Sequence, residues 1–294
     1  MRLRLEPALV ELAAGGSVQG QIYIYDNWAL QKLLRSAFSI TLYGQSKAKI
    51  MTSRGALMTE SVRFLEQETT LDDTRQQLEA QEGRPPYRIA FRLPLPTDLP
   101  ASFESHSGSV IYWLVAQCKA SSGLRSKVKS PSVCIFISSG QLVKGEATPR
   151  PYALTKSKRL SAGWRETGCI AVSAHLPLGP RYAPGDSIPL KVGVSNQSRG
   201  GVRGLRVMLV QSTAYRAKGT SLDQQSRLLC AKSNAVVPKG RHLLFGQVNE
   251  IQVPVEALRS LESPCCSVRH AIEFHAIRGG FHPSVCLTMP IEII

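Results

Sequence analysis

Apolar and polar residues alternate along most of this chain, and a period of two predicts β-strands that each bury one face. Between Ser17 and Tyr25, for example, Val18, Ile22 and Ile24 share one face, while polar and tyrosine side chains occupy the other. The same pattern predicts strands at Phe38 to Gly44, Ser61 to Gln67, Tyr87 to Leu93, Gly108 to Cys118 and Ser132 to Ser138. Turn-forming segments separate these strands, as in an antiparallel β-sandwich.

Two segments depart from simple alternation. The strand from Gly108 to Cys118 carries apolar residues on both faces, so we expect both faces to be covered and Trp113 to lie in a core. Asp72 to Ala80 has an acidic start followed by helix-forming residues, which predicts a surface helix of at most two turns. No segment has a sustained helical stripe, and the predicted fold class is therefore all-β.

The second half of the chain repeats the plan of the first. Ser17 to Ile24 aligns with Ser187 to Val194, Phe38 to Leu42 with Leu205 to Leu209, and Ser109 to Leu114 with Ser267 to Ile272. A chain of 294 residues also suits two domains better than a single core. We therefore predict two tandem antiparallel immunoglobulin-like β-sandwich domains, residues 1–143 and 167–294, joined by a basic linker at residues 144–166.

The composition is that of an ordinary globular protein, with 43% hydrophobic and 19% charged residues. The N-terminus lacks the continuous apolar core of a signal peptide, and no apolar run approaches the length of a bilayer span. Since the seven cysteines are an odd number and form no CxxC pair, we expect a cytoplasmic protein with reduced thiols. Cys118, Cys134 and Cys286 are expected to be buried in apolar strands.

The net charge of +15 has a local concentration, because the segment from Lys119 to Arg165 holds ten basic residues and one acid. A basic surface attracts phosphorylated tails, anionic lipid headgroups and nucleic acid. Nucleic acid is disfavoured because the segment lacks interleaved aromatic residues for base stacking. The alternative is a solvated basic face without a specific ligand. The candidate basic patch for binding an anion or a partner consists of Lys119, Arg125, Lys127, Lys129, Lys156, Lys158 and Arg159.

No residue pattern indicates catalysis. The chain contains no G-x-S-x-G elbow, P-loop, G-x-G-x-x-G or H-E-x-x-H motif. Cys265 and Cys266 precede His270 and His275 and so suggest a metal site, but alternation along a strand directs the two histidines to opposite faces. We therefore expect no catalytic residues, no metal site and no cofactor.

Two stretches with fixed internal spacings carry more specific information. A strand ends in F-R-L-P at Pro94, and L-P-A-S-F-E-S-H-S-G-S-V-I-Y follows from Leu99 to Tyr112. The second stretch reads Y-A-P-G-D-S-I from Tyr182 and continues to N-Q-S at Asn196. These stretches resemble the N-terminal and C-terminal domains of the arrestins, and most closely those of the alpha-arrestin branch.

The resemblance implies a non-catalytic adaptor or scaffold that binds cytosolic tails or loops of membrane proteins and links them to endocytic or endosomal sorting and ubiquitination. Such a protein would associate peripherally with the plasma membrane or endosomes, and its basic surface could contact phosphoinositides. Alpha-arrestins recruit ubiquitin ligases through PPxY motifs, whereas Pro85-Pro86 leads directly into Tyr87 here. A ubiquitin ligase is thus an expected partner only if a PPxY tail exists outside this chain.

Two other functions stay open at this point. The chain could be a structural arrestin-like subunit of a retromer-type sorting complex, or a generic polyanion-binding module. A stable stoichiometric complex would indicate the first, and steep salt dependence without preference for receptor tails would indicate the second.

Overall fold

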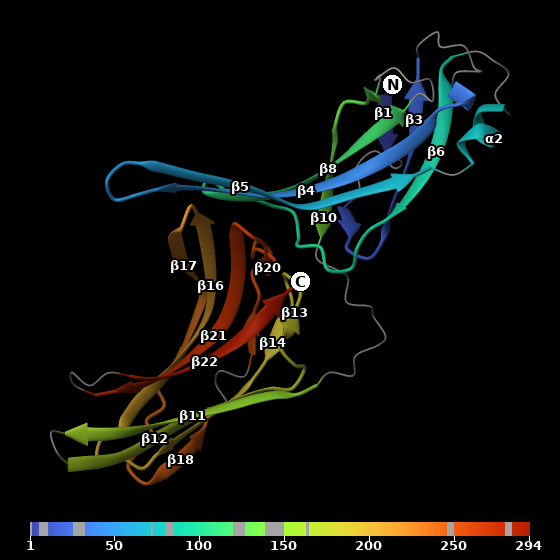
Figure 1. The fold of residues 1–294 in the computed structure, drawn as a ribbon. Coiled ribbons are helices and arrows are strands. Elements are labelled where there is room, and N and C mark those ends of the chain that lie inside the picture. The colour runs from blue at the N-terminus through green and yellow to red at the C-terminus, as the bar shows by residue number, and fades with distance from the viewer. Residues whose placement is uncertain are drawn as a thin grey trace. The chain divides into compact units, whose positions relative to one another are not determined.

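The computed structural model describes residues 2–5, 11–25, 33–71, 73–79, 85–119, 127–138, 150–162, 165–245, 250–279 and 284–294. The chain divides into two compact units (Figure 1). The first contains Met1–Gln141, Tyr215–Leu222 and Leu261–Ser267, and the second contains Leu142–Ala214, Asp223–Ser260 and Val268–Ile294. Among the described residues, no helix is long and apolar enough to cross a membrane.

The described strands of the first half of the chain form two sheets. The elements are β1 (Arg2–Leu5), β2 (Glu11–Ala13), β3 (Ser17–Ile24), β4 (Ala37–Met51), β5 (Leu57–Thr70), α2 (Thr74–Glu79), β6 (Tyr87–Pro94), β7 (Phe103–Glu104), β8 (Gly108–Lys119), β9 (Lys127–Lys129) and β10 (Val133–Ser138). One sheet has the order β1-β3-β6, and the other has the order β2-β10-β8-β4-β5, with β7 and β9 also paired to β8. The strands β4 and β5 form a long hairpin, visible in Figure 1.

The strands that the structure describes in the second half of the chain form three sheets. Its strands are β11 (Tyr152–Ala162), β12 (Arg165–Leu176), β13 (Arg181–Tyr182), β14 (Ser187–Pro189), β15 (Lys191–Asn196), β16 (Val202–Ala217), β17 (Thr220–Ser233), β18 (Arg241–Leu244), β19 (Glu250–Gln252), β20 (Leu261–Glu262), β21 (Cys266–Arg278) and β22 (Val285–Ile293). The sheet orders are β11-β12-β15-β18, β13-β22-β21-β16-β17 with β20 beside β21, and β14-β19.

The strand orders confirm the repeat that the sequence predicts. The order β2-β10-β8-β4-β5 in the first half corresponds, strand for strand, to β13-β22-β21-β16-β17 in the second. In each case the first pair, β2 with β10 and β13 with β22, is parallel. The main pairings of the larger strands, such as β4 with β8 and β21 with β22, are antiparallel. The all-β class and the arrangement as antiparallel sandwiches are thus confirmed.

Alternation places the core as expected in most strands. In β6 the side chains of Tyr87, Ile89, Phe91 and Leu93 are buried, and the residues between them are exposed. The strand β8 differs from its prediction. Its even-numbered residues are buried, but on the opposite face the residues from Ser109 to Val115, which include Trp113, are only half-buried. The physical reason is that a single half-covered face can hold large apolar side chains when they pack on one another, as Trp113 does on Tyr43 with ring centroids 5.4 Å apart.

Two local predictions have different outcomes. The helix expected within Asp72 to Ala80 is present as α2, and its one buried side chain is Leu78. Part of the predicted basic linker instead forms the eleven-residue strand β11. Tyr152, Leu154 and Leu160 alternate toward one face there, but the intervening lysines obscure that pattern in the sequence. The domain boundaries at residues 143 and 167 stay predictions.

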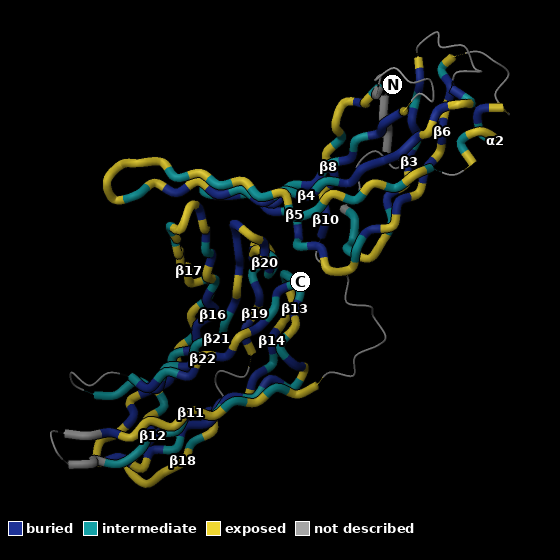
Figure 2. The backbone as a smooth tube through the Cα atoms, in the orientation of Figure 1, coloured by how far each residue is buried: buried dark blue, intermediate teal, exposed yellow. Residues whose placement is uncertain are grey.

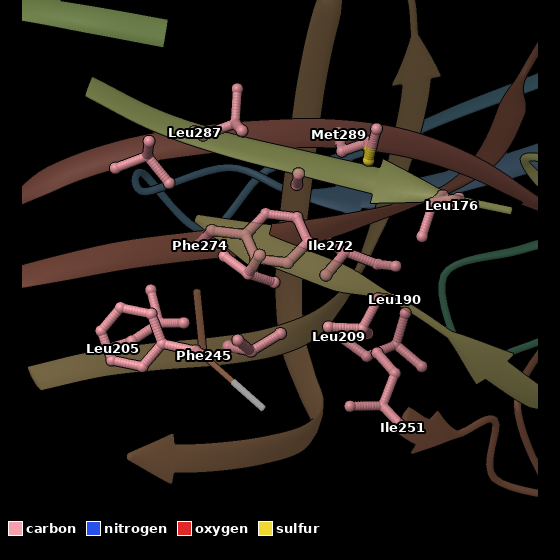
Figure 3. Close-up of a cluster of buried hydrophobic side chains, with 14 of the residues drawn as sticks. Leu176, Leu190, Leu205, Leu209, Phe245, Ile251, Ile272, Phe274, Leu287 and Met289 are labelled. Atoms are coloured by element: carbon pink, nitrogen blue, oxygen red, sulfur yellow. The ribbon is translucent and has the colours of Figure 1, made fainter. Parts of the chain in front are cut away.

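The core of the second unit lies between its sheets. Figure 3 shows Leu176 of β12, Leu205 and Leu209 of β16, Phe274 of β21 and Leu287 of β22 in one cluster. These side chains are at most 3% exposed. Because both sheets of the sandwich contribute side chains to this cluster, the backbones of β21 and β22 are held rigidly from their inner side.

Candidate functional site

The first motif stretch builds the connection between β6 and β8. The hydroxyl of Tyr112 donates to the Pro100 carbonyl at 2.7 Å, and Ser102 accepts a bond from the Ile137 amide on β10 at 2.9 Å. Gly108 is a tight position, because an added Cβ would lie 2.5 Å from the Cys266 sulfur. The fixed spacing of this stretch therefore has a structural cause in the first unit.

The second motif stretch forms a turn that closes on itself. The Asp186 carboxylate accepts a hydrogen bond from the Ala183 amide at 2.7 Å, and Gly185 adopts a φ of +89°. That left-handed conformation is open to glycine without steric cost. Tyr182 is buried and donates to the Gly179 carbonyl at 2.7 Å, and burial raises the pKa of Tyr182 to about 12.

Asn196 is a buried structural residue rather than an exposed one. Its side-chain amide donates to the carbonyls of Gly200 at 2.8 Å and Val237 at 2.9 Å. Its side-chain oxygen accepts from both the amide and the hydroxyl of Ser198. All the polar atoms of this side chain are thus used in joining β15 to the loops beside it.

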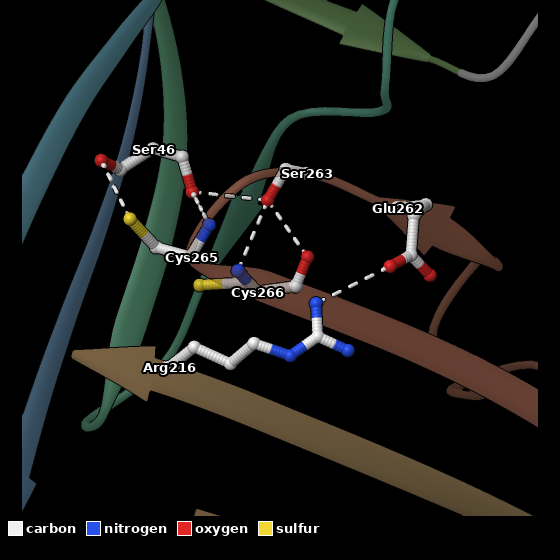
Figure 4. A network of polar contacts seen from close by, with 6 residues as sticks. All are labelled: Ser46, Arg216, Glu262, Ser263, Cys265 and Cys266. Carbon is white, nitrogen blue, oxygen red and sulfur yellow. Dashed lines mark hydrogen bonds and ion pairs between the residues drawn. The ribbon is translucent and has the colours of Figure 1, made fainter. Parts of the chain in front are cut away.

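A buried polar network joins distant segments of the first unit (Figure 4). The hydroxyls of Ser46 and Ser263, 217 positions apart, lie 2.9 Å from each other. The Ser46 hydroxyl also accepts from the Cys265 amide at 3.2 Å, and the Cys266 sulfur donates to the Lys47 carbonyl at 3.1 Å. Such a network orients β4 and the segment before β21 because each buried polar group has a partner.

The thiols of this network are structural groups. Burial raises the pKa of Cys265, and it raises the pKa of Cys266 to about 11, so both thiols are protonated near neutral pH. The prediction of buried cysteines is right for Cys118, but Cys134 is exposed and Cys286 is half-buried. The latter two lie on strand faces that solvent reaches, which an apolar run of sequence does not reveal.

Three members of the candidate basic patch belong to the first unit. Lys119 of β8 and Lys127 of β9 are cross-strand partners, and Lys129 is exposed two residues further along β9. The Lys119 ammonium also contacts the Glu68 carboxylate at 3.0 Å. Arg125 lies outside the described residues. The structure therefore brings Lys119 and Lys127 together at neighbouring positions of one strand pair.

The other three members belong to the second unit and follow one another along β11. Lys156 and Lys158 pair with Val172 and Ile170 of β12, and Arg159 points to the opposite face. All three residues are exposed, and the tube of β11 in Figure 2 has the colour of exposed residues along part of its length. Because β11 is at one end of the order β11-β12-β15-β18 among the described strands, these cations lie on an edge strand of the sheet as described. The continuity of the full patch stays a prediction.

The two histidines of β21 face opposite sides, as predicted. His270 is 2% exposed, and its Nδ1 and Nε2 lie 3.0 Å from the Ser260 hydroxyl and 3.2 Å from the Gln211 side-chain oxygen. Burial lowers the pKa of His270 to about 4, so its ring is neutral at pH 7. His275 is half-buried on the outer face, where its neighbours differ entirely from those of His270.

Sequence reasoning missed a cluster of metal-ligating side chains around His275. Glu273 and His275 of β21 lie on the same face as Cys286 of β22, and their ligand-type atoms all lie within 4.8 Å of one another. Glu273 and His275 are two residues apart, so the sequence alone could have placed them on the same face of a strand. Cys286 joins them only through the register of β21 and β22, which no local pattern encodes.

Comparison with known proteins identifies the second half of the chain. The family model described as Arrestin (or S-antigen), C-terminal domain, matches residues 167–294. Residues 167–294 thus form a domain of the arrestin family. The match contains the buried turn at Tyr182 and the Asn196 network, so the resemblance seen in the second motif stretch is confirmed. Arrestin-family proteins are in general non-catalytic adaptors or scaffolds that bind the tails of membrane receptors.

Proposed function

We propose that this protein is an adaptor of the alpha-arrestin type that binds cytosolic tails or loops of membrane proteins and links them to endocytic or endosomal sorting and ubiquitination. The family match and the motif stretch from Leu99 to Tyr112 support this proposal. It would act peripherally at the plasma membrane or endosomes, with phosphoinositides as additional ligands. Recruitment of a ubiquitin ligase would require a PPxY segment outside this chain.

The single observation that carries the proposal is the cationic edge strand β11. Residues 155–159 are exposed in succession, and three of these five residues are Lys156, Lys158 and Arg159. An edge strand can add an extended peptide by main-chain pairing, and its side chains then select the peptide. An acidic or phosphorylated tail is the complementary partner, because opposite charges steer association and fix the register.

The test measures binding of a fluorescent synthetic peptide in which glutamate alternates with phosphoserine, with a glutamine and serine version as its neutral counterpart. We expect the wild-type chain to bind the charged peptide and the double variant Lys156→Glu, Lys158→Glu to bind it at least about tenfold more weakly. Thermal unfolding should stay nearly unchanged because exposed charges contribute little to stability.

A matched control carries the same change in charge elsewhere in the second unit. Lys232 and Lys239 are also exposed, so the variant Lys232→Glu, Lys239→Glu alters the net charge equally without touching β11. Retained binding by this control would support the edge-strand site. Equal losses in both variants would show that overall charge, rather than β11, attracts the peptide, and would favour the generic polyanion-binding module.

The retromer-type alternative predicts a different observation. A constitutive structural subunit would be recovered from cells in a stoichiometric complex that survives moderate salt. An adaptor that relies on β11 should instead release its partners as salt rises, since exposed charges are screened over about 10 Å at 0.1 M ionic strength.

A further inference from the structure

The outer face of β21 and β22 brings three different metal-ligating side chains together. In the antiparallel register His275 lies directly opposite Cys286, and Glu273 lies two residues before His275 on the same face. The three residues thus supply a nitrogen, a sulfur and a carboxylate oxygen from two adjacent strands. Thr288, the cross-strand partner of Glu273, places its hydroxyl 3.8 Å from the Cys286 sulfur.

The distances suit a small tetrahedral ion. The Nε2 atom of His275 lies 3.4 Å from the Cys286 sulfur and 2.9 Å from a Glu273 oxygen, and all three ligand atoms are within 4.8 Å of one another. Zinc bound at its usual ligand distances would hold nitrogen, oxygen and sulfur about 3.3–3.6 Å apart. Small side-chain rotations therefore convert this cluster into three corners of a zinc tetrahedron.

The pattern of contacts differs from that of a proton relay. In a nucleophile-histidine-acid triad, the acid binds one ring nitrogen and the nucleophile binds the other. Here the Glu273 carboxylate and the Cys286 sulfur both approach the same atom, Nε2 of His275. The three ligand-type atoms are thus mutual neighbours, as a shared metal ion requires, and the contacts do not run through the ring from one nitrogen to the other.

The surroundings hold the ligands in place and admit water, and the ammonium of Lys156 on β11 also acts on the Cys286 thiol. Phe274 and Leu287, the inward-facing neighbours of these ligands, are at most 3% exposed and hold both strands in the core. The side chains of Glu273 and His275 are 20% and 21% exposed, so water can reach a fourth coordination position. A carboxylate and a thiolate neutralise a dication locally, and because the thiol gives up one proton on binding, the net charge of +15 rises by only one.

We propose that Glu273, His275 and Cys286 bind one zinc-class dication, with water as the fourth ligand. A mixed nitrogen, oxygen and sulfur set suits zinc better than magnesium or calcium, which prefer oxygen ligands alone. As the metal–sulfur bond forms, the Cys286 thiol releases its proton to solvent. Because the cysteine binds the ion as a thiolate, the affinity for the ion should increase with pH.

The experiment titrates the reduced full chain with cobalt(II) and then displaces cobalt with zinc. We expect one cobalt ion per chain and a thiolate-to-cobalt charge-transfer band that zinc removes. Cys286→Ser should abolish the band, His275→Ala should weaken binding at least about tenfold, and Glu273→Gln should weaken it by a smaller factor. Zinc should also raise the melting temperature of the wild-type chain and leave that of Cys286→Ser unchanged.

The control is Cys230→Ser, since Cys230 is an exposed thiol on β17 in the same unit. This variant should keep the band and the stoichiometry of the wild type. The proposal is overturned if the wild-type chain shows no thiolate band, or if Cys286→Ser retains it. Since the outer-face substitutions leave the core intact, unaltered circular dichroism of each variant would attribute a loss of binding to the missing ligand.

Discussion

Acid should destabilise the second unit through His270. Its buried ring has a pKa of about 4 in the folded chain, against 6.5 for an unperturbed histidine. Between these values the unfolded state binds more protons than the folded state, so the free energy of unfolding decreases as the pH falls from 6.5 toward 4. Each pKa unit corresponds to about 1.4 kcal/mol, so lowering the pH from 7 to 4.5 should cost about 2–3 kcal/mol through this group.

The hydrogen bonds explain why the neutral ring is preferred. Since the Gln211 oxygen only accepts, the Nε2 atom of His270 carries the hydrogen, and its Nδ1 accepts from the Ser260 hydroxyl. That hydroxyl in turn accepts from the Ile293 amide at 2.9 Å. A second ring proton would force the Ser260 hydroxyl to give up its donated bond in a buried site.

The assay is urea unfolding followed by circular dichroism at a series of pH values, for the wild type and for His270→Gln. Glutamine offers a donor and an acceptor but does not titrate. The unfolding transition that His270→Gln shifts at pH 7 is the transition of the second unit. The wild type should lose about 2–3 kcal/mol more than His270→Gln between pH 7 and pH 4.5. His242→Gln, at an exposed position of β18, should behave as the wild type does. Parallel pH profiles for the wild type and His270→Gln would refute the reasoning.

Two further predictions concern the first unit. Trp113→Ala should lower the free energy of unfolding by about 2–3 kcal/mol, which is less than the usual cost of truncating a fully buried tryptophan. The reason is that one side of the ring stacks on Tyr43 and the residue is only half-buried. A loss above about 4 kcal/mol would show that this face is covered. Gly108→Ala should cost about 1–3 kcal/mol in urea unfolding because its Cβ would lie 2.5 Å from the Cys266 sulfur and 2.9 Å from the Lys47 carbonyl. In the double variant Gly108→Ala, Cys266→Ala, the smaller side chain at position 266 should recover part of that loss. If the losses in unfolding free energy of the two single variants simply add, the contact between these residues is not the cause.

Much of the fold could be predicted because alternation is a local property. The predicted strand at Tyr87 to Leu93 differs from β6 by one residue, and the sequence repeat anticipated the matching strand orders of the two halves. Where alternation was interrupted, prediction was incomplete. The strand β4 continues to Met51, seven residues beyond its predicted end, through the bulge between Gly44 and Gln45 that breaks the period of two.

The candidate sites divide in the same way. The sequence alone could name Lys156, Lys158 and Arg159 as basic, but their place on an edge strand follows from the pairing of β11 with β12. It could also separate His270 from His275, because residues an odd number apart on a strand face opposite sides. Alternation therefore determined which way each side chain points relative to its own backbone.

Which side chains meet across strands was decided by the tertiary structure. Cys286 and His275 are eleven residues apart, and a shift of one residue in the pairing of β21 and β22 would turn the cysteine to the other face. Ser46 and Ser263 meet only because their segments, 217 positions apart, pack together in one unit. The physical reason is that register and strand order minimise the free energy of the whole core, to which distant residues contribute as much as neighbours.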